Sequence, residues 1–397
     1  MIYIILLIHL LLIIINFYIS KYFLYPPTVF VSVWSIALFC LILLGDFFYP
    51  ISEFTLLIFT LGAIAFSLGG FLVMLCSYKT SHYVNHHIGK LLDISLFLVI
   101  IMFPFYIWKL QELSALSGVD DFFIGLRTQT SGTKEKTGLG IFAYINSLAG
   151  FIALAAFSES LKFAYSKYKT ALILLVAFSY GLMSTARTAT ILLLLSLACI
   201  YMLRRKLTLK TLLIITIIFI ILFAVPAIIL EKGGSKESSL SENLISLIEN
   251  LQIYAFAGLI AFDQTVLHPG SISSGNGTFG FFLSLFKAFG FDIEIKSSVL
   301  EYSSTPWLTN VYTIYFPYYT DFGLYGLIAI MVLLGAIITI FYRLSILGDS
   351  AFIILYSIGF SSLIFSLFAE SLFISLSYWI QTAILVYFFY KVRVRVF

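Results

Sequence analysis

Residues 54–77 read FTLLIFTLGAIAFSLGGFLVMLCS, and this stretch carries no charged side chain. A helix of that length rises about 36 Å at about 1.5 Å per residue, which exceeds the hydrocarbon thickness of a bilayer. An apolar run of roughly 20 residues is typical of a membrane-spanning helix. The stretch therefore predicts a chain whose solvent is a bilayer.

The same pattern recurs along the chain. With roughly 20 apolar residues per span, the sequence predicts about eleven membrane-spanning helices. They cover residues 2–19, 28–48, 54–77, 91–110, 139–158, 170–184, 188–203, 211–230, 322–342, 351–369 and 372–390. The predicted fold class is all-α: a polytopic membrane protein with a large outer (periplasmic) loop that contains interfacial helices.

The sixth and seventh predicted helices, residues 170–184 and 188–203, are short. As one continuous helix they would be too long for a single crossing. We therefore predict a tight hairpin that turns at residues 184–187. A single span would instead invert the orientation of everything before it.

The composition agrees with a membrane protein. Hydrophobic residues make up 61% of the chain and charged residues 11%, against roughly 25% charged in a typical soluble domain. The mean hydropathy is +1.06. The net charge of +4 does not indicate nucleic-acid binding, because the positive residues lie in short loops between apolar runs.

The positions of lysine and arginine predict the orientation. The residues assigned to the cytoplasm are Lys21, Lys79, Lys90, Lys162, Lys167, Lys169, Arg204, Arg205, Lys206, Lys210, Arg343, Lys391, Arg393 and Arg395. The remaining lysines and arginines are Arg187 and residues of two long loops. The positive-inside rule therefore predicts a cytoplasmic C-terminus and, with an odd number of spans, an N-terminus outside.

Two long outer segments, 111–137 and 231–320, divide the chain. We predict an N-terminal bundle over residues 1–230 with about eight helices, a periplasmic loop over 231–320, and about three C-terminal helices over 321–397. The large loop is expected to form an ordered cap. Residues 239–242 have the form of a helix capping box, and the apolar stretch 253–262 is too short to span a membrane. Asn276-Gly277 marks a turn. Residues 279–291 are expected to lie in the interface or to re-enter the membrane.

Two arginines are candidate ligands for an anionic substrate. Arg187 lies between two apolar helices, where an arginine is costly unless it faces a partner, a cavity or the interface. It either snorkels at the hairpin tip or binds an anion from the outer leaflet. Arg127 is followed by a polar run that can wrap a phosphate or a sugar, or it is an ordinary solvated residue.

Acidic and aromatic residues supply the other candidates. Asp263 and His268 form the Asp–His pair of the large loop and are candidates for a base and its orienting group. Asp321 lies where the outer loop enters the membrane, and either takes part in catalysis or caps a helix N-terminus. Tyr312 and Tyr319 suit both an interfacial aromatic belt and sugar stacking.

Several types of chemistry lack their usual sequence patterns. The chain has no glycine-rich phosphate loop, no Cys/His metal spacing and no Gly-x-Ser-x-Gly elbow. The cluster of His82, His86 and His87 is better interpreted as a solvated loop than as a metal site. We therefore expect neither a metal nor a cofactor.

The layout and three local patches resemble the Wzy-type O-antigen polymerases, which join oligosaccharide repeat units. The patches are residues 184–189 (STARTA), residues 254–263 (YAFAGLIAFD) and residues 310–326 (NVYTIYFPYYTDFGLYG). Some members of that family carry an arginine followed by ten residues and a glycine, and Arg127 with Gly138 fits this spacing. The large loop departs from it because it contains no arginine.

The resemblance implies a specific reaction. Such enzymes are glycosyltransferases of the bacterial inner membrane that act at its periplasmic face on undecaprenyl-pyrophosphate-linked oligosaccharides. The growing chain leaves its lipid carrier and is joined to a hydroxyl of the incoming unit. A chain-length regulator and a flippase of the same pathway are the implied protein partners.

Two alternatives stay open. An O-antigen ligase, which transfers finished glycan to the lipid A core, has a similar layout. A lipid-linked oligosaccharide flippase or other transporter belongs to another class, in which paired repeats and broken helices are common. We find no internal repeat in this sequence, and this favours the polymerase.

Overall fold

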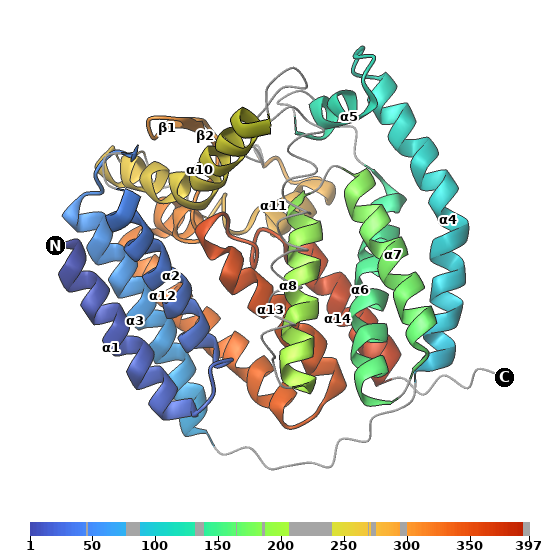
Figure 1. Cartoon of the computed structure of the whole chain (residues 1–397), viewed down its shortest axis with the longest axis horizontal. Helices are drawn as coiled ribbons and strands as arrows, with labels where there is room; N and C mark the ends of the chain where they lie inside the picture. Colours follow the sequence, from blue (N-terminus) through green and yellow to red (C-terminus); the bar gives the residue numbers. More distant parts are fainter. Residues whose placement is uncertain are drawn as a thin grey trace. The chain divides into compact units, whose positions relative to one another are not determined.

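The computed structural model in Figure 1 describes residues 1–44, 47–76, 88–131, 139–163, 165–184, 187–205, 240–268, 270, 275–293 and 300–391. Helices account for almost all of its regular structure. A single two-stranded antiparallel pairing joins β1 (Ser303–Ser304) to β2 (Leu308–Thr309) in the described part. The all-α prediction is confirmed.

Ten of the predicted spans coincide with helices. These are α1 (Ile2–Ser20), α2 (Pro26–Leu44), α3 (Glu53–Leu75), α4 (Gly89–Ala115), α6 (Ile141–Lys162), α7 (Lys167–Met183), α8 (Arg187–Arg204), α12 (Tyr315–Ile346), α13 (Ser350–Ile364) and α14 (Leu376–Tyr390). The predicted span 211–230 lies outside the described residues, and so does Ser239 of the predicted capping box. From Leu240 to Glu242 the structure describes only a helical backbone. Among the residues that the structure describes, seven helices are long and apolar enough to cross a membrane.

The hairpin prediction is confirmed by two separate helices. α7 ends at Met183 and α8 begins at Arg187. The two helices approach closely at Gly181, where an added Cβ would lie 2.6 Å from the Thr190 hydroxyl. The absence of a side chain at Gly181 therefore allows the hairpin to close.

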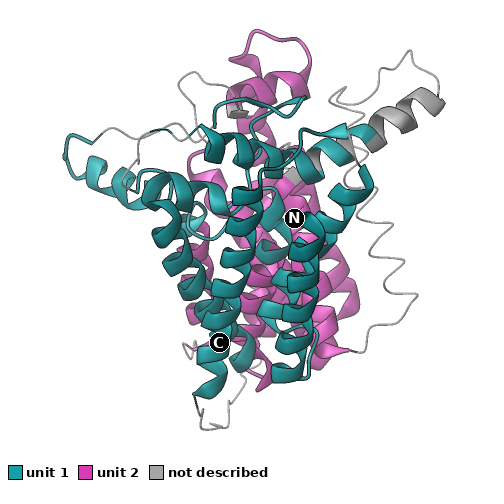
Figure 2. Cartoon of the chain, turned by 90° about the vertical axis from the view of Figure 1, so that its left-hand side faces the viewer, with its two compact units in different colours: residues 1–81, 249–344, 362–377 teal, residues 82–248, 345–361, 378–397 magenta. Residues whose placement is uncertain are grey.

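The chain forms two compact units that each combine segments far apart in sequence (Figure 2). Unit 1 comprises residues 1–81, 249–344 and 362–377, and unit 2 comprises residues 82–248, 345–361 and 378–397. The three-part division at residues 230 and 320 follows the order of the chain and stays a prediction.

Unit 1 is held together by close packing of α3 against α12. A Cβ at Gly69 would clash with the Val332 carbonyl, and a Cβ at Gly335 would clash with the Phe66 carbonyl. Small residues let helix backbones approach in this way inside membranes. Beside this crossing the buried ring of Trp34 packs on Phe59 and Tyr315 at centroid distances of 4.8 and 4.6 Å.

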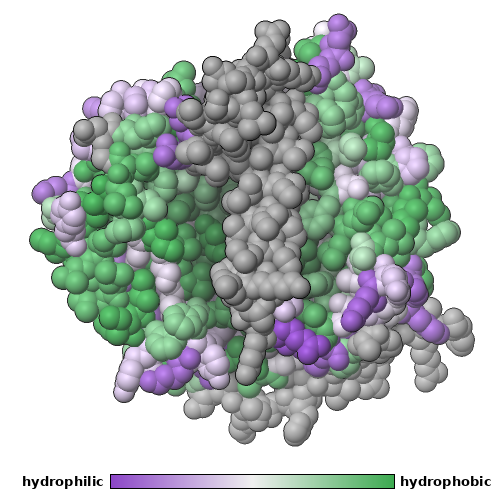
Figure 3. Space-filling model, in the orientation of Figure 1, coloured by the Kyte–Doolittle hydropathy of each residue, from purple (hydrophilic) through white to green (hydrophobic). Residues whose placement is uncertain are grey.

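The surface of α1 is that of a helix in lipid. Its side chains Ile4, Leu7, Ile14 and others are exposed, whereas His9, Asn16 and Ser20 are buried. Asn16 donates a hydrogen bond of 3.0 Å to Ser67 of α3. Figure 3 shows broad hydrophobic faces over the helices. This inversion of the soluble pattern is expected for a helix that faces hydrocarbon.

Helix α12 contains a break that the sequence prediction missed. Gly323 adopts φ 65° and ψ −165°, so a short helix over residues 315–322 precedes a longer one that runs to Ile346. The longer part rises about 34 Å, which suffices for a complete span. The predicted start at residue 322 therefore coincides with the break, and the helical segment before it carries Asp321.

Candidate functional site

Four separate segments meet at one end of unit 1. The Ile314 amide donates to the Ser366 carbonyl at 2.8 Å, and a Cβ at Gly258 would lie 3.0 Å from the Leu367 carbonyl. Gly258 belongs to α10 (Leu240–Leu267), the long helix of the large loop, which includes the predicted apolar stretch 253–262. Three buried acids, Asp263, Asp321 and Glu370, lie on these segments, and we call this region the carboxylate end.

Asp263 is fully buried near the end of α10. Its Oδ1 atom accepts hydrogen bonds from the Ser52 hydroxyl at 2.6 Å and from the Ser52 amide at 3.0 Å. Ser52 also caps α3, because its Oγ accepts from the Thr55 amide. The Oδ2 atom of Asp263 has no hydrogen-bond partner among the described residues. One oxygen thus orients the carboxylate, and the other is buried without a hydrogen-bond donor among the described residues.

Asp321 joins α12 to a turn of the large loop. Its Oδ1 accepts from the Gly277 amide at 3.2 Å, and its Oδ2 accepts from the Thr278 amide at 2.6 Å. The predicted turn at Asn276-Gly277 is confirmed, since residues 275–278 form it. The amides bound by Asp321 belong to this turn and not to the first turn of α12, which begins six residues earlier at Tyr315.

His268 lies just beyond α10 and is exposed. Its backbone amide donates to the Gln264 carbonyl at 3.0 Å. Within the described part of the chain no hydrogen bond links its imidazole to Asp263. The structure assigns the orienting contact of Asp263 to Ser52, a residue that the sequence did not indicate.

The two candidate tyrosines flank the same end of unit 1. Tyr312 donates to the Glu301 carbonyl at 3.1 Å, and its ring lies 4.0 Å from that of Phe316. Burial, aided by the charge of Glu301, raises the pKa of Tyr312. Tyr319 packs edge-on against Phe262, the residue before Asp263, at 5.7 Å. Tyr319 therefore packs against α10, the helix that carries Asp263.

Glu370 is the most extensively hydrogen-bonded of the three acids. It accepts from the Tyr318 hydroxyl at 2.8 Å and from the amides of Leu372, Phe373 and Ile374 at 2.6 to 2.9 Å. Burial raises its pKa, and these hydrogen bonds oppose that shift. Glu370 stabilises the loop before α14, and this role could not be recognised from an isolated glutamate in the sequence.

Both candidate arginines belong to unit 2. Arg127 is half-buried in α5 (Phe122–Ser131). The start of α5 is fixed by Asp121, which accepts from the Ile124 amide at 2.9 Å, and by Ser114 of α4, which donates to the Phe122 carbonyl at 2.9 Å. Arg187 is the first residue of α8, and its side chain lies outside the described residues, as does Gly138.

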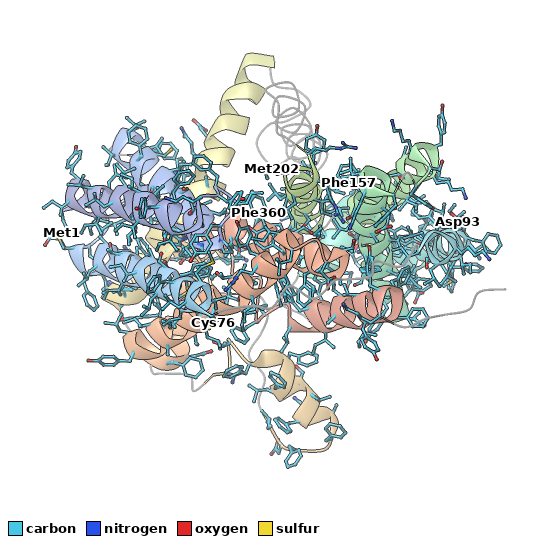
Figure 4. The ribbon with its side chains drawn as sticks, turned by 90° about the horizontal axis from the view of Figure 1, so that it is seen from below. Met1, Cys76, Asp93, Phe157, Met202 and Phe360 are labelled. Carbon is cyan, nitrogen blue, oxygen red and sulfur yellow. The ribbon has the colours of Figure 1, made fainter. Side chains whose placement is uncertain are left out.

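A basic cluster lies at one end of unit 2. Arg204 donates to Ser158 and Ser350 at 3.2 and 3.0 Å, and Lys391 pairs with Asp349 at 3.1 Å. Nearby on α4, Asp93, labelled in Figure 4, pairs with Lys169 at 2.6 Å. These contacts join the ends of helices that carry the positive residues assigned to the cytoplasm.

The structure offers no obvious metal centre in its described residues. No group of three or more His, Cys, Asp or Glu side chains there is arranged to hold an ion. The histidines at positions 82, 86 and 87 lie outside the described part. The described side chains at the carboxylate end include carboxylates, hydroxyls and aromatic rings.

These features define the class: a polytopic α-helical membrane protein with a buried acidic region formed in part by its large loop. The family described as putative O-antigen polymerase matches residues 1–367, so the chain belongs to this family. It is 32% identical over 164 residues to an O-antigen polymerase of Shigella dysenteriae. That similarity covers 41% of this chain and 40% of the relative. No solved structure matches.

Proposed function

We propose that this protein joins undecaprenyl-pyrophosphate-linked oligosaccharide units into O-antigen or a similar surface polysaccharide. The observation that carries this proposal is family membership over residues 1–367, combined with a buried carboxylate, Asp263, that has one oriented and one unbonded oxygen. We place the reaction at the periplasmic face of the bacterial inner membrane. A chain-length regulator and a flippase of the same pathway are the proposed protein partners.

The proposed reaction is a glycosyl transfer. The bond between the donor's anomeric carbon and its pyrophosphate breaks, and a hydroxyl oxygen of the incoming unit forms the new glycosidic bond. Asp263 takes the hydroxyl proton through Oδ2, while Ser52 holds Oδ1. His268 and Asp321 are the other proposed catalytic groups of this region. The released lipid carrier leaves with its pyrophosphate.

The leaving group carries negative charge, which cations can stabilise. We assign this role to Arg127 and Arg187, since the planar guanidinium binds two phosphate oxygens at once. Tyr312 and Tyr319 are the proposed sugar-stacking residues.

The ends of the helices support the proposed orientation. In unit 1, Ser52 at the start of α3 binds Asp263, whereas Arg343 donates to the Cys76 carbonyl at the other end of α3 at 2.6 Å. Arg343 belongs to the positive set assigned to the cytoplasm. The carboxylate end therefore lies away from that set within unit 1, as an outer-face site requires.

Deletion of the gene distinguishes the proposal from the two alternatives. A polymerase defect leaves single repeat units on the lipid A core in place of a ladder, and the full-length gene restores the ladder. Loss of a ligase removes glycan from the core altogether. Loss of a flippase or another exporter traps lipid-linked units on the cytoplasmic side, and either of these results would overturn the proposal.

A further inference from the structure

Helix α11 (Gly280–Ala288) has no fully buried residue and presents a partly exposed apolar face. Phe282, Leu285 and Phe286 are 41 to 48% exposed, and Phe289, just after the helix, is 73% exposed. Their spacing of three, four and seven residues places them on one side of the helix, with Ser284 and Lys287 on the other. In water such a face is unfavourable by about 25 cal/mol for each Å² of apolar surface.

The position of α11 is fixed relative to the start of a membrane span. Phe279 packs on Phe322 of α12 at 5.7 Å and on Phe373 at 5.9 Å. Phe322 directly precedes the break at Gly323, after which the long apolar part of α12 begins. The start of α11 thus lies at the level where the long apolar part of α12 begins.

The orientation of α11 fits that level. Figure 4 shows it projecting away from the spanning helices of unit 1. A helix in the plane of the membrane surface, apolar on one side and polar on the other, is the arrangement of an interfacial helix. On a lipid surface the exposed phenylalanines need no protein partner.

We propose that α11 is embedded in the surface of the lipid leaflet, with the Phe282–Phe289 face among acyl chains and Lys287 at the phosphate level. We further assign Asp321 as the positioning residue that tethers it. Its carboxylate holds the Gly277 and Thr278 amides, and these residues immediately precede α11. The proposal rests on the membrane fold and does not depend on the proposed reaction.

Nitroxide labels test the lipid contact. Cysteine is introduced at Phe286 or, as the matched control, at Ser284, in a full-length chain whose Cys40, Cys76 and Cys199 are replaced by alanine. In phospholipid nanodiscs, oxygen should enhance the spin relaxation of the label at 286 more than a water-soluble nickel chelate does. The label at 284 should show the reverse. A label at 286 that favours nickel, or is shielded from both reagents by a protein surface, would overturn the lipid assignment.

The tether is tested with the same label. Asp321→Ala should shift the label at 286 towards the nickel chelate. The neighbouring Thr320→Ala should not, because the Thr320 hydroxyl donates to the Phe316 and Pro317 carbonyls of its own helix. Asp321→Asn serves if the alanine variant fails size-exclusion chromatography. An unchanged accessibility in the folded Asp321 variant, even with all polymer lost, would contradict the tether and leave a catalytic role.

Discussion

At the scale of the residue, the proposed proton transfer depends on the free oxygen of Asp263. Asp263→Asn keeps an oxygen that can accept from Ser52 but removes the carboxylate that takes a proton. General bases contribute roughly 10²- to 10⁴-fold, so we expect polymer synthesis to fall by at least about a hundredfold. Glycan ladders with immunoblots for protein amount measure this. Ser52→Ala is the control, in which we expect a smaller loss of polymer synthesis. A normal ladder from Asp263→Asn would exclude Asp263 as the general base.

The two arginines are tested with alanine variants, which remove the positive charge, and with lysine variants, which keep the charge but lose the planar guanidinium group. Arg187→Ala and Arg127→Ala should abolish long polymer at normal protein levels, and the lysine variants should retain little activity because they lose the planar fork. A charge-assisted hydrogen bond is worth about 1.5 to 3 kcal/mol, or roughly ten- to a hundredfold in rate. Full-length ladders from both alanine variants would show that these arginines only anchor helices.

At the level of the helices, we expect the close crossing of α3 and α12 to contribute to the stability of unit 1. Gly335→Ala places a methyl group against the Phe66 carbonyl, a backbone atom that cannot rotate away. We expect a lower thermal midpoint in detergent, measured by dye-based unfolding. Gly150→Ala in α6 is the matched control, because nothing lies within 4 Å of its added Cβ. There the change should be neutral or stabilising by up to about 1 kcal/mol. Equal midpoints for the two variants would refute the close contact.

The helices themselves were largely predictable, and their tertiary contacts were not. Long apolar runs must form helices in a bilayer, so the spans and the hairpin before Arg187 followed from hydropathy and length. The dipeptide Asn276-Gly277 predicted the turn before α11. Ser52 and Asp263 are 211 residues apart, and the turn at Gly277 is 44 residues from Asp321. No local pattern encodes such pairings, and the short helix before Gly323 was not expected because residues 315–320 were assigned to the outer loop.

At the scale of the whole molecule, the orientation in the membrane is a separate prediction. Cysteines introduced at positions 134 and 236 should react in intact spheroplasts with a membrane-impermeant maleimide, and cysteines at 167 and 204 should react only after lysis. The reason is the gathering of lysine and arginine in one set of short segments. A cysteine at 167 that reacts from outside would reverse the topology and remove the outer-face site.

The stoichiometry of the products tests the polymerisation of lipid-linked units most directly. Purified protein in proteoliposomes is supplied with undecaprenyl-pyrophosphate-linked repeat units, and both glycan length and released undecaprenyl pyrophosphate are measured. We predict a ladder of products with one carrier pyrophosphate released for each glycosidic bond formed, and neither product with Asp263→Asn. Carrier release without a ladder, or transfer only to added lipid A core, would contradict the claim.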